Sequence, residues 1–383
     1  MNRPVYLDNH ATTQIDRRVL QTMLPYFTEY FGNPSSGGHS YGWEAQSAVK
    51  AARVALAKEI NCSPEEIIFT SGATEANNLA IKGFAEANHH RGKHIITVIT
   101  EHSAVLDPCN YLASLGFEIS YLPVDNFGLV DVEMFEQTIR TDTILASVML
   151  ANNEIGVYQP IEEIAEVCER TGVTLHTDSA QAVGKIPIDL QKLPIGMMSM
   201  TAHKIHGPKG VGALFVRKQP RVNIAPQLHG GGQERGLRAG TVCTPQVVGF
   251  AKAVQIALEE RRTEMERILN MRELLWRRLQ QLPGIYLNGH PTKRLPGNLN
   301  VSVDGVDGNA LHADLRSIVA VSSGSACSEG KPSHVLLAIG RSERLARASL
   351  RFGIGRFNTP EEIEEVAERV SAVIKNLQQK TRP

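Results

Sequence analysis

The stretch SMTAHKIHGPKGVG, at residues 199–212 of this 383-residue chain, sets the interpretation of the sequence around it. It places Lys204 between His203 and His206, after a short apolar run and before a turn rich in Gly and Pro. Such a pattern predicts a strand that ends in a loop. A lysine partly buried there can have a lowered pKa and can form a Schiff base with an aldehyde. On this stretch alone, a surface lysine in a turn is at least as good an interpretation.

Strand and helix patterns alternate along the chain that precedes this stretch. Short apolar runs predict strands at residues 65–70, 94–99, 117–122, 143–150 and 173–178. Helical periodicity lies between them, at residues 74–89, 104–115, 131–140 and 161–170. Two further apolar runs lead to Met200 and Val216, and earlier helices are predicted at residues 16–31, capped by Asp16, and at residues 43–60. Strands that alternate with helices predict an α/β fold with a mostly parallel central sheet.

The pattern changes near Thr244, where a second domain is predicted to begin. A long helix at residues 245–282 is followed by shorter strands and helices, and a final amphipathic helix starts at Pro360. This mixture predicts a smaller α+β domain, and the chain is long enough for two domains. We expect a large domain at residues 16–250 and a small domain formed by residues 1–15 and 251–383.

Composition excludes several classes of function. Lys plus Arg equals Asp plus Glu, at 40 each, so net charge gives no case for binding nucleic acid or a membrane surface. No apolar run approaches the roughly 20 residues of a membrane helix, and the N-terminus has no apolar signal region. An odd number of cysteines without a CxxC pair argues against a disulfide framework or a cysteine zinc site. We therefore expect a cytoplasmic protein with reduced thiols, which are Cys62, Cys109, Cys168, Cys243 and Cys327.

Two motifs at predicted strand ends point to one ligand when they are taken with Lys204. SGATEANN, at residues 71–78, enters a predicted helix through a turn that contains glycine. The free N–H groups of such a turn, together with the Thr74 hydroxyl, are suited to binding a phosphate. An ordinary helix cap is the alternative interpretation of this motif. Asp178 ends a buried strand and needs a partner, for which a protonated pyridine nitrogen is suitable. Phosphate, pyridinium and aldehyde together describe pyridoxal phosphate.

Other polar residues keep two interpretations. His102 follows a predicted strand and is a candidate for ring stacking or proton transfer, although a lone histidine is more often structural. Asn153 follows another strand, where it equally suits a turn cap. Cys327 lies among small polar residues and is the best candidate for an exposed reactive thiol, with an incidental loop cysteine as the alternative.

A family resemblance selects among these interpretations. The motifs YLDNHATT, FGNPSS, SGATEANN, TEHSAV, NNEIGV, HTDSAQ, TAHKIHGPKG, GGGQERGLRAGT, SSGSACS, PSHVL and RFGIGRFNT occur in this order. Together they resemble the cysteine desulfurases of the NifS/IscS type, relatives of the class V pyridoxal-phosphate-dependent aminotransferases. The resemblance covers nearly the whole chain, and HKIHGPKG, GGGQERGLRAGT and SSGSAC are its most specific parts. It implies a fold-type I enzyme and a homodimer, with the large domain binding the cofactor.

The resemblance also implies roles for individual residues. Lys204 would hold pyridoxal 5'-phosphate, with His102 stacked on its ring and active in proton transfer, and Cys327 would accept sulfur. The remaining cofactor contacts would come from Ala73, Thr74, Asn153, Asp178, Gln181, Thr201 and His203, and from Thr241 toward the phosphate of the neighbouring subunit. The substrate would be bound by Asn33, Asn153 and Arg351.

The implied reaction converts L-cysteine to L-alanine and leaves a persulfide on Cys327. The sulfur would pass to an iron–sulfur scaffold or a tRNA-thiolation carrier. No intrinsic metal is expected, but Cys327 is a candidate transient ligand of an iron–sulfur cluster on a scaffold. The segment after Cys327 is shorter than in the best-known housekeeping members, and the C-terminus lacks their longer scaffold-docking tail, so the acceptor stays open.

Three alternatives to this reaction remain. The chain could be a selenocysteine lyase, another class V aminotransferase or β-lyase, or an idle sulfur-relay subunit with a vestigial site. The last is disfavoured because Lys204, Asp178 and Cys327 are all present. His10 stands where a small residue is expected, and the sequence offers no reason for it.

Overall fold

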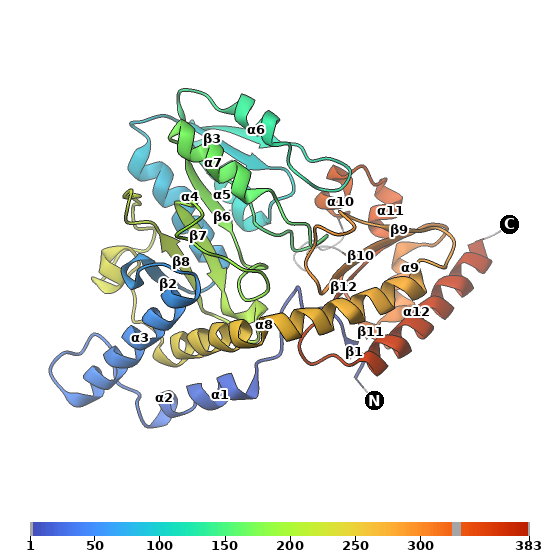
Figure 1. Ribbon diagram of the computed structural model, residues 1–383, viewed down its shortest axis with the longest axis horizontal. Coiled ribbons are helices and arrows are strands. Elements are labelled where there is room, and N and C mark those ends of the chain that lie inside the picture. Colours follow the sequence, from blue (N-terminus) through green and yellow to red (C-terminus); the bar gives the residue numbers. More distant parts are fainter. Residues whose placement is uncertain (1–2, 324–330, 382–383) are drawn as a thin grey trace.

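A seven-stranded sheet forms the centre of the larger part of the molecule in the computed structural model, which describes residues 3–323 and 331–381 (Figure 1). From one edge to the other its strands are β2 (Ile67–Thr70), β8 (Gly212–Val216), β7 (Met197–Thr201), β6 (Thr174–Asp178), β5 (Thr143–Ser147), β3 (His94–Val98) and β4 (Glu118–Leu122). All pairs from β7 to β4 are parallel, and β8 runs antiparallel to both β2 and β7. The predicted α/β fold with a mostly parallel sheet is confirmed, and every strand except β8 ends at the same edge.

Helices cover both faces of this sheet because successive strand residues point to opposite faces. Ile67 and Phe69 of β2 belong to one apolar cluster, whereas Ile68 belongs to another. The first cluster includes residues of α3, α6, α7 and the first half of α8, and the second includes residues of α4 and α5. These helices are α3 (Ser40–Glu59), α4 (Ala73–Asn88), α5 (Ser103–Ser114), α6 (Val132–Thr138), α7 (Ile161–Thr171) and α8 (Thr244–Leu279). The layers are therefore helix, sheet and helix.

The first predicted helix is shorter than its periodicity suggests. Asp16 caps α1 (Arg17–Met23) by accepting from the backbone N–H of Arg18, as expected. The chain then forms a separate short helix, α2 (Pro25–Thr28), instead of continuing to residue 31. The break falls at Pro25, which has no N–H to donate within a helix.

A second core surrounds a smaller antiparallel sheet near both chain ends (Figure 1). Helix α8 contributes Phe250 to the first core and Leu275 to the second, and Figure 1 shows it extending from beneath the large sheet toward α12. The N-terminal strand pairs in parallel with β11 of this region. The predicted boundary at residue 250 lies within α8, and the division into two domains stays a prediction. The elements are β1 (Val5–Tyr6), β9 (Ile285–Leu287), β10 (Asn298–Val303), β11 (Val319–Ala320), β12 (Ser349–Gly353), α9 (Gly308–Leu315), α10 (His334–Ala338), α11 (Glu343–Arg347) and α12 (Pro360–Thr381).

Among the described residues, none of the helices combines the length and apolarity needed to cross a membrane.

A buried histidine ties three strands of the large sheet together. His176 of β6 pairs through Nδ1 with Ser147 Oγ of β5 at 2.8 Å, and through Nε2 with Ser199 Oγ of β7 at 3.0 Å. Burial lowers the pKa of His176 to about 4, a shift that nearby Asp178 opposes. The imidazole is therefore neutral in the folded chain at neutral pH, with each ring nitrogen paired to a hydroxyl group.

This histidine makes folding sensitive to acid. Because its pKa is lower in the folded chain than the 6.5 of the unfolded chain, its contribution is complete above pH 6.5 and is lost as the pH falls toward 4. We expect it to account for about 3 kcal/mol of the unfolding free energy lost over that range. Urea unfolding at several pH values, compared between wild type and His176→Gln, measures this term. If the unfolding free energy depended on pH in the same way in both proteins, the expectation would be contradicted. His90→Gln, which changes an exposed histidine, is the control.

Candidate active site

The carboxyl ends of five strands surround a cavity of about 440 Å³. Loops that follow β2, β3, β5, β6 and β7 reach it, as expected for a ligand site at this edge of an open α/β sheet. Most of the predicted site residues meet here although they are far apart in sequence. Those that line the cavity are Ala73, Thr74, His102, Asn153, Asp178, Gln181, Thr201, His203, Lys204 and Arg351.

The N-terminus of α4 forms one wall of this cavity. Gly72 precedes the helix with a φ of +154°, and it has no side chain to cap the first N–H groups. These groups, beginning with Ala73 and Thr74, have no acceptor within the helix and carry the positive end of its dipole. A Cβ atom on Gly212 of β8 would lie 2.7 Å from the Gly72 backbone, so only glycine at position 212 allows β8 this close to the start of α4. The wall therefore suits an anionic group, with the Thr201 hydroxyl close by.

Lys204 also lines the cavity, at the end of a short 3-10 turn (Ala202–Lys204) that follows β7. Its Nζ donates to the backbone carbonyls of His10 and Ala11, the latter at 2.6 Å. His203, beside it, pairs through Nδ1 with Thr12 Oγ1 at 3.1 Å. Burial and the positive charge of Lys204 lower the pKa of His203 to about 4, so its ring is neutral at neutral pH. The predicted strand end at Lys204 is confirmed, and the N-terminal segment holds its amine in place.

Asp178 presents a buried carboxylate at the end of β6. Asn77 of α4 donates from Nδ2 to Asp178 Oδ2 at 2.7 Å, and the backbone N–H of Ala180 donates to Oδ1 at 2.9 Å. The residue is 6% exposed and lines the cavity. These two neutral donors fix the orientation of the carboxylate but do not neutralise it. Among the described residues, no cationic side chain forms an ion pair with Asp178.

Removing this charge is expected to slow catalysis strongly. In Asp178→Asn, the side chain keeps its size but no longer stabilises a positive charge in the cavity, and we expect kcat to fall by about 10²–10³-fold. Asn77→Ala keeps the charge and removes one hydrogen bond, so its loss should be about tenfold. Steady-state kinetics of the two variants provide the comparison. Equal losses would mean that Asp178 acts through its position and not through its charge.

His102 follows β3 and caps α5. Its Nδ1 accepts from the backbone N–H of Ala104 at 3.1 Å, so a neutral ring carries its proton on Nε2. Burial lowers the pKa of His102, while Asp178 acts against the shift. The ring lines the cavity in a fixed tautomer, which suits both stacking and proton transfer.

Arg351 belongs to β12 in the smaller sheet, and it lines the cavity together with residues of the large sheet. Its side chain is 1% exposed, and it donates to the carbonyl of Asn153 at 3.1 Å and to Asp8 Oδ1 at 2.9 Å. The other carboxyl oxygen of Asp8 accepts from Ser322 Oγ at 2.9 Å. A buried guanidinium beside a cavity is a suitable partner for a substrate carboxylate.

Two of the predicted residues that the structure describes are not among those that line this cavity. Thr241 is exposed and lines a separate cavity of about 120 Å³, which shares Ser71 and Gly210 with the first. Asn33 is exposed, and its Oδ1 accepts from the backbone N–H of Ser35 at 2.9 Å. Cys327 lies outside the described residues.

Sequence reasoning missed Asn77, which lines the cavity, and Asp8 and Lys185, which contact the cavity residues Arg351 and Gln181. Asn77 stands one helical turn after Thr74, and Lys185 stands four residues after Gln181, so spacing within each motif could have suggested both. Asp8 had no such signal, because its partner Arg351 is 343 residues away.

Known proteins share this sequence and fold. The family described as aminotransferase class-V matches residues 5–366. A protein named cysteine desulfurase IscS from Methylobacillus flagellatus is 51% identical over 379 residues, covering 98% of this chain and 93% of that protein. A protein of the same name from Methylococcus capsulatus is 50% identical over 366 residues, covering 95% of this chain and 91% of that protein.

Solved structures give the same result. One described as a NifS-like protein superposes with a TM-score of 0.91 at 39% identity, covering 98% of this chain and 100% of that chain. Another, described as SspA in complex with cysteine, has a TM-score of 0.83 at 36% identity, covering 93% of this chain and 100% of that chain. Members of this family are pyridoxal phosphate enzymes. The predicted resemblance is confirmed, and the chain belongs to the class V aminotransferase family, among the cysteine desulfurases.

Proposed function

We propose that this chain is a pyridoxal-phosphate-dependent cysteine desulfurase, which converts L-cysteine to L-alanine and transfers the sulfur to Cys327 as a persulfide. The observation that carries the proposal is the arrangement of Lys204, Asp178 and the α4 N-terminus around one cavity. About half of the sequence is identical to relatives that bear this name, over nearly their whole length. A neighbour at 36% identity is described in complex with cysteine.

The residues present fit the cofactor. The uncapped start of α4, with Thr74 and Thr201, would bind its phosphate. Asp178, whose oxygens accept from two neutral donors, has a charge suited to a protonated ring nitrogen. Lys204 would hold the cofactor through its amine, and the cavity of about 440 Å³ has room for it together with a small amino acid.

The chain's own groups account for the steps of the reaction. When bound, pyridoxal phosphate supplies an electron sink for the α-carbon of the substrate. Arg351 and Asn153 would hold the substrate carboxylate. Lys204, once the substrate amine has taken its place, would move the α-proton, and His102 would exchange a second proton through Nε2.

Sulfur transfer would use Cys327. Its thiolate would attack the substrate sulfur, and the electron pair of the broken C–S bond would stay with the fragment that becomes L-alanine after protonation. The sequence motif SSGSACS supports this role. The name IscS of the relatives favours iron–sulfur cluster assembly as the destination of the sulfur, with tRNA thiolation as the second candidate.

We also propose that the enzyme is a cytoplasmic homodimer. Thr241 is exposed and lines its own cavity beside the main one. This position supports a contact with the cofactor phosphate of a second subunit. The cytoplasmic location rests on the odd cysteine count and on the absence of CxxC pairs from the sequence.

An assay of the purified protein tests the proposed function. An absorbance band near about 400 nm should appear after reconstitution with pyridoxal 5'-phosphate. L-Cysteine should then yield alanine, and mass spectrometry should find one extra sulfur atom on the peptide that contains Cys327. A protein that forms pyruvate or no product from L-cysteine would contradict the proposal, and faster turnover of L-selenocysteine would favour the lyase alternative.

A further inference from the structure

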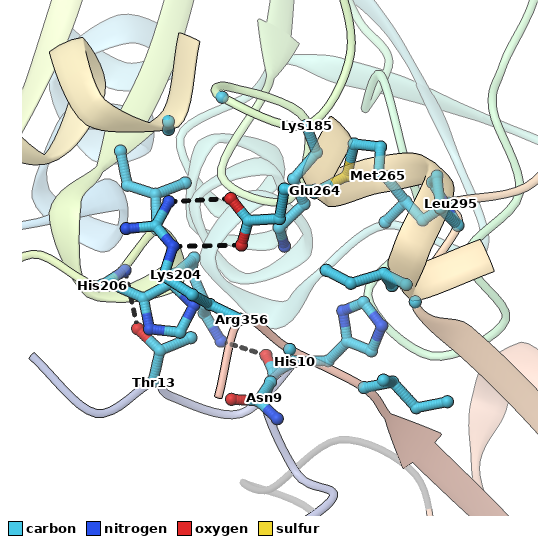
Figure 2. Close-up of a pocket in the computed structure, with 18 residues that line it drawn as sticks. Asn9, His10, Thr13, Lys185, Lys204, His206, Glu264, Met265, Leu295 and Arg356 are labelled. Carbon is cyan, nitrogen blue, oxygen red and sulfur yellow. Dashed lines mark hydrogen bonds and ion pairs between the residues drawn. The ribbon is translucent and has the colours of Figure 1, made fainter. Parts of the chain in front are cut away.

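A second, smaller cavity of about 40 Å³ lies behind Lys204. His10 and Lys204 line both cavities, whereas Lys185 lines only the smaller one. Figure 2 shows Lys185, Lys204 and His10 around this space, with the Lys204 amine directed at the His10 carbonyl. Neither Lys185 nor the His10 side chain has a role in the reaction described above, and each is a buried or partly buried titratable group.

Both side chains contact the same amide, that of Gln181. Lys185 Nζ donates to Gln181 Oε1 at 3.0 Å, and His10 Nδ1 lies 3.0 Å from the same oxygen. Gln181 Nε2 donates one hydrogen to the His10 backbone carbonyl at 2.9 Å. Gln181 is 4% exposed and lines the larger cavity. Both the oxygen and the nitrogen of its amide are therefore hydrogen-bonded.

These contacts permit one orientation of the amide. A backbone carbonyl can only accept, and Lys185 can only donate as long as it carries its proton. A rotated amide would place its oxygen against the His10 carbonyl and its nitrogen against Lys185, so that both contacts would become repulsive. The oxygen therefore faces Lys185 and the nitrogen keeps a second hydrogen, for which no acceptor is recorded among the described residues.

The protonation of His10 agrees with this arrangement. Burial and the charge of Lys185 place the pKa of His10 well below its usual value, so the ring is neutral and has one N–H group. That hydrogen must lie on Nδ1 to be donated to Gln181 Oε1. Burial and the charge of Lys204 lower the pKa of Lys185 to about 7, with Glu264 acting against the shift. Keeping such a lysine next to Gln181 costs stability, which favours a functional reason for it.

We propose that Lys185 and His10 are positioning residues, which lock the Gln181 amide so that the second N–H of its nitrogen would be available to the ring oxygen of the cofactor. The inference rests on the proposed function, because it requires pyridoxal phosphate in the larger cavity. Two donors on Oε1 polarise the amide and strengthen donation from Nε2. This ring oxygen would carry the most negative charge when the linkage between Lys204 and the cofactor has no proton. A donor at this oxygen therefore favours the deprotonated linkage and keeps its pKa low.

A spectrophotometric pH titration of the reconstituted enzyme measures this effect without turnover. In Lys185→Met, the amide oxygen of Gln181 loses one of its two donors, while the contacts with His10 remain. We expect the apparent pKa of the absorbance change near about 400 nm to rise by about 1 unit, the equivalent of one hydrogen bond of usual strength. A titration identical to that of wild type would overturn the proposal.

A mutant cycle separates positioning from charge. Gln181→Ala should raise the apparent pKa as well, and adding Lys185→Met to Gln181→Ala should change nothing further. If the lysine acted through its own charge on the cofactor, its shift would persist in the double variant, which would overturn the proposal. Thermal unfolding of each variant separates these shifts from loss of folding.

His10 allows an independent test by rescue. His10→Ala removes the ring donor and should raise the apparent pKa, whereas His10→Asn places an amide N–H near the position of Nδ1 and should restore a value close to that of wild type. Equal titrations of the two variants would remove His10 from the proposal. A wild-type enzyme without any band near about 400 nm would instead contradict the proposed function, so the two failures are distinguishable.

Discussion

Lys204→Ala is expected to abolish both the cofactor absorbance and the turnover of L-cysteine. The Lys204 amine lies at the wall of the main cavity, fixed by the carbonyls of His10 and Ala11. Alanine offers no amine to hold the cofactor and no base for the α-proton. General acid–base catalysis alone contributes about 10²–10⁴-fold, and because cofactor attachment is lost as well, we expect a loss of turnover beyond that range. Absorbance after reconstitution and alanine formation are the two measurements.

The control for this variant is another lysine. Lys192→Ala, at an exposed loop position where the amine lies 3.6 Å from Asp189, should behave as wild type. Lys185 is the alternative attachment point, because its pKa of about 7 suits the chemistry and it lines the smaller cavity together with Lys204. If Lys204→Ala kept the absorbance band and Lys185→Ala lost it, the cofactor would have to be assigned to Lys185.

Cys327→Ser is expected to stop sulfur transfer while it leaves the cofactor site intact. A serine hydroxyl is a far weaker nucleophile than a cysteine thiolate at neutral pH, so alanine formation should fall by at least about 10²-fold. The persulfide should be absent from the chain, while the absorbance near about 400 nm should match that of wild type. Product analysis and mass spectrometry on the same sample measure both effects.

This variant also separates the alternatives for the reaction. An aminotransferase or β-lyase has no need of Cys327, so equal alanine or pyruvate formation in the variant and the wild type would mean that the cofactor chemistry is right and the sulfur-transfer assignment is wrong. Cys243→Ser is the matched control, because Cys243 is exposed and precedes α8 near Thr241. Its activity should equal that of wild type.

The sheet and the strand-end residues were predictable because they depend on local patterns. Alternating apolar runs predicted the strands, Asp178 is the last residue of a buried strand, and Lys204 follows another within a few residues. Chain connectivity then places the ends of parallel strands at one edge, which brings these residues together. The limits of the prediction appear at Pro25, where a single residue divides a helix that periodicity had extended, and at α11, which was not predicted.

Contacts between distant segments were beyond the sequence. Asp8 pairs with Arg351 because β1 joins the small sheet region, and Asn77 reaches Asp178 because α4 packs over β6. His10 had no explanation in the sequence, and only the fold places its ring 3.0 Å from Gln181.

The sequence by itself determined the family, the α/β class and the residues that carry the chemistry, because these follow from short motifs and from periodicities set by the backbone. Tertiary structure decided how those residues are held: the carbonyls that fix Lys204, the amide that orients Asp178, and the packing of Lys185 and His10 on Gln181. Such contacts depend on burial and on side chains brought together across the fold, and neither is encoded in any local stretch of the chain.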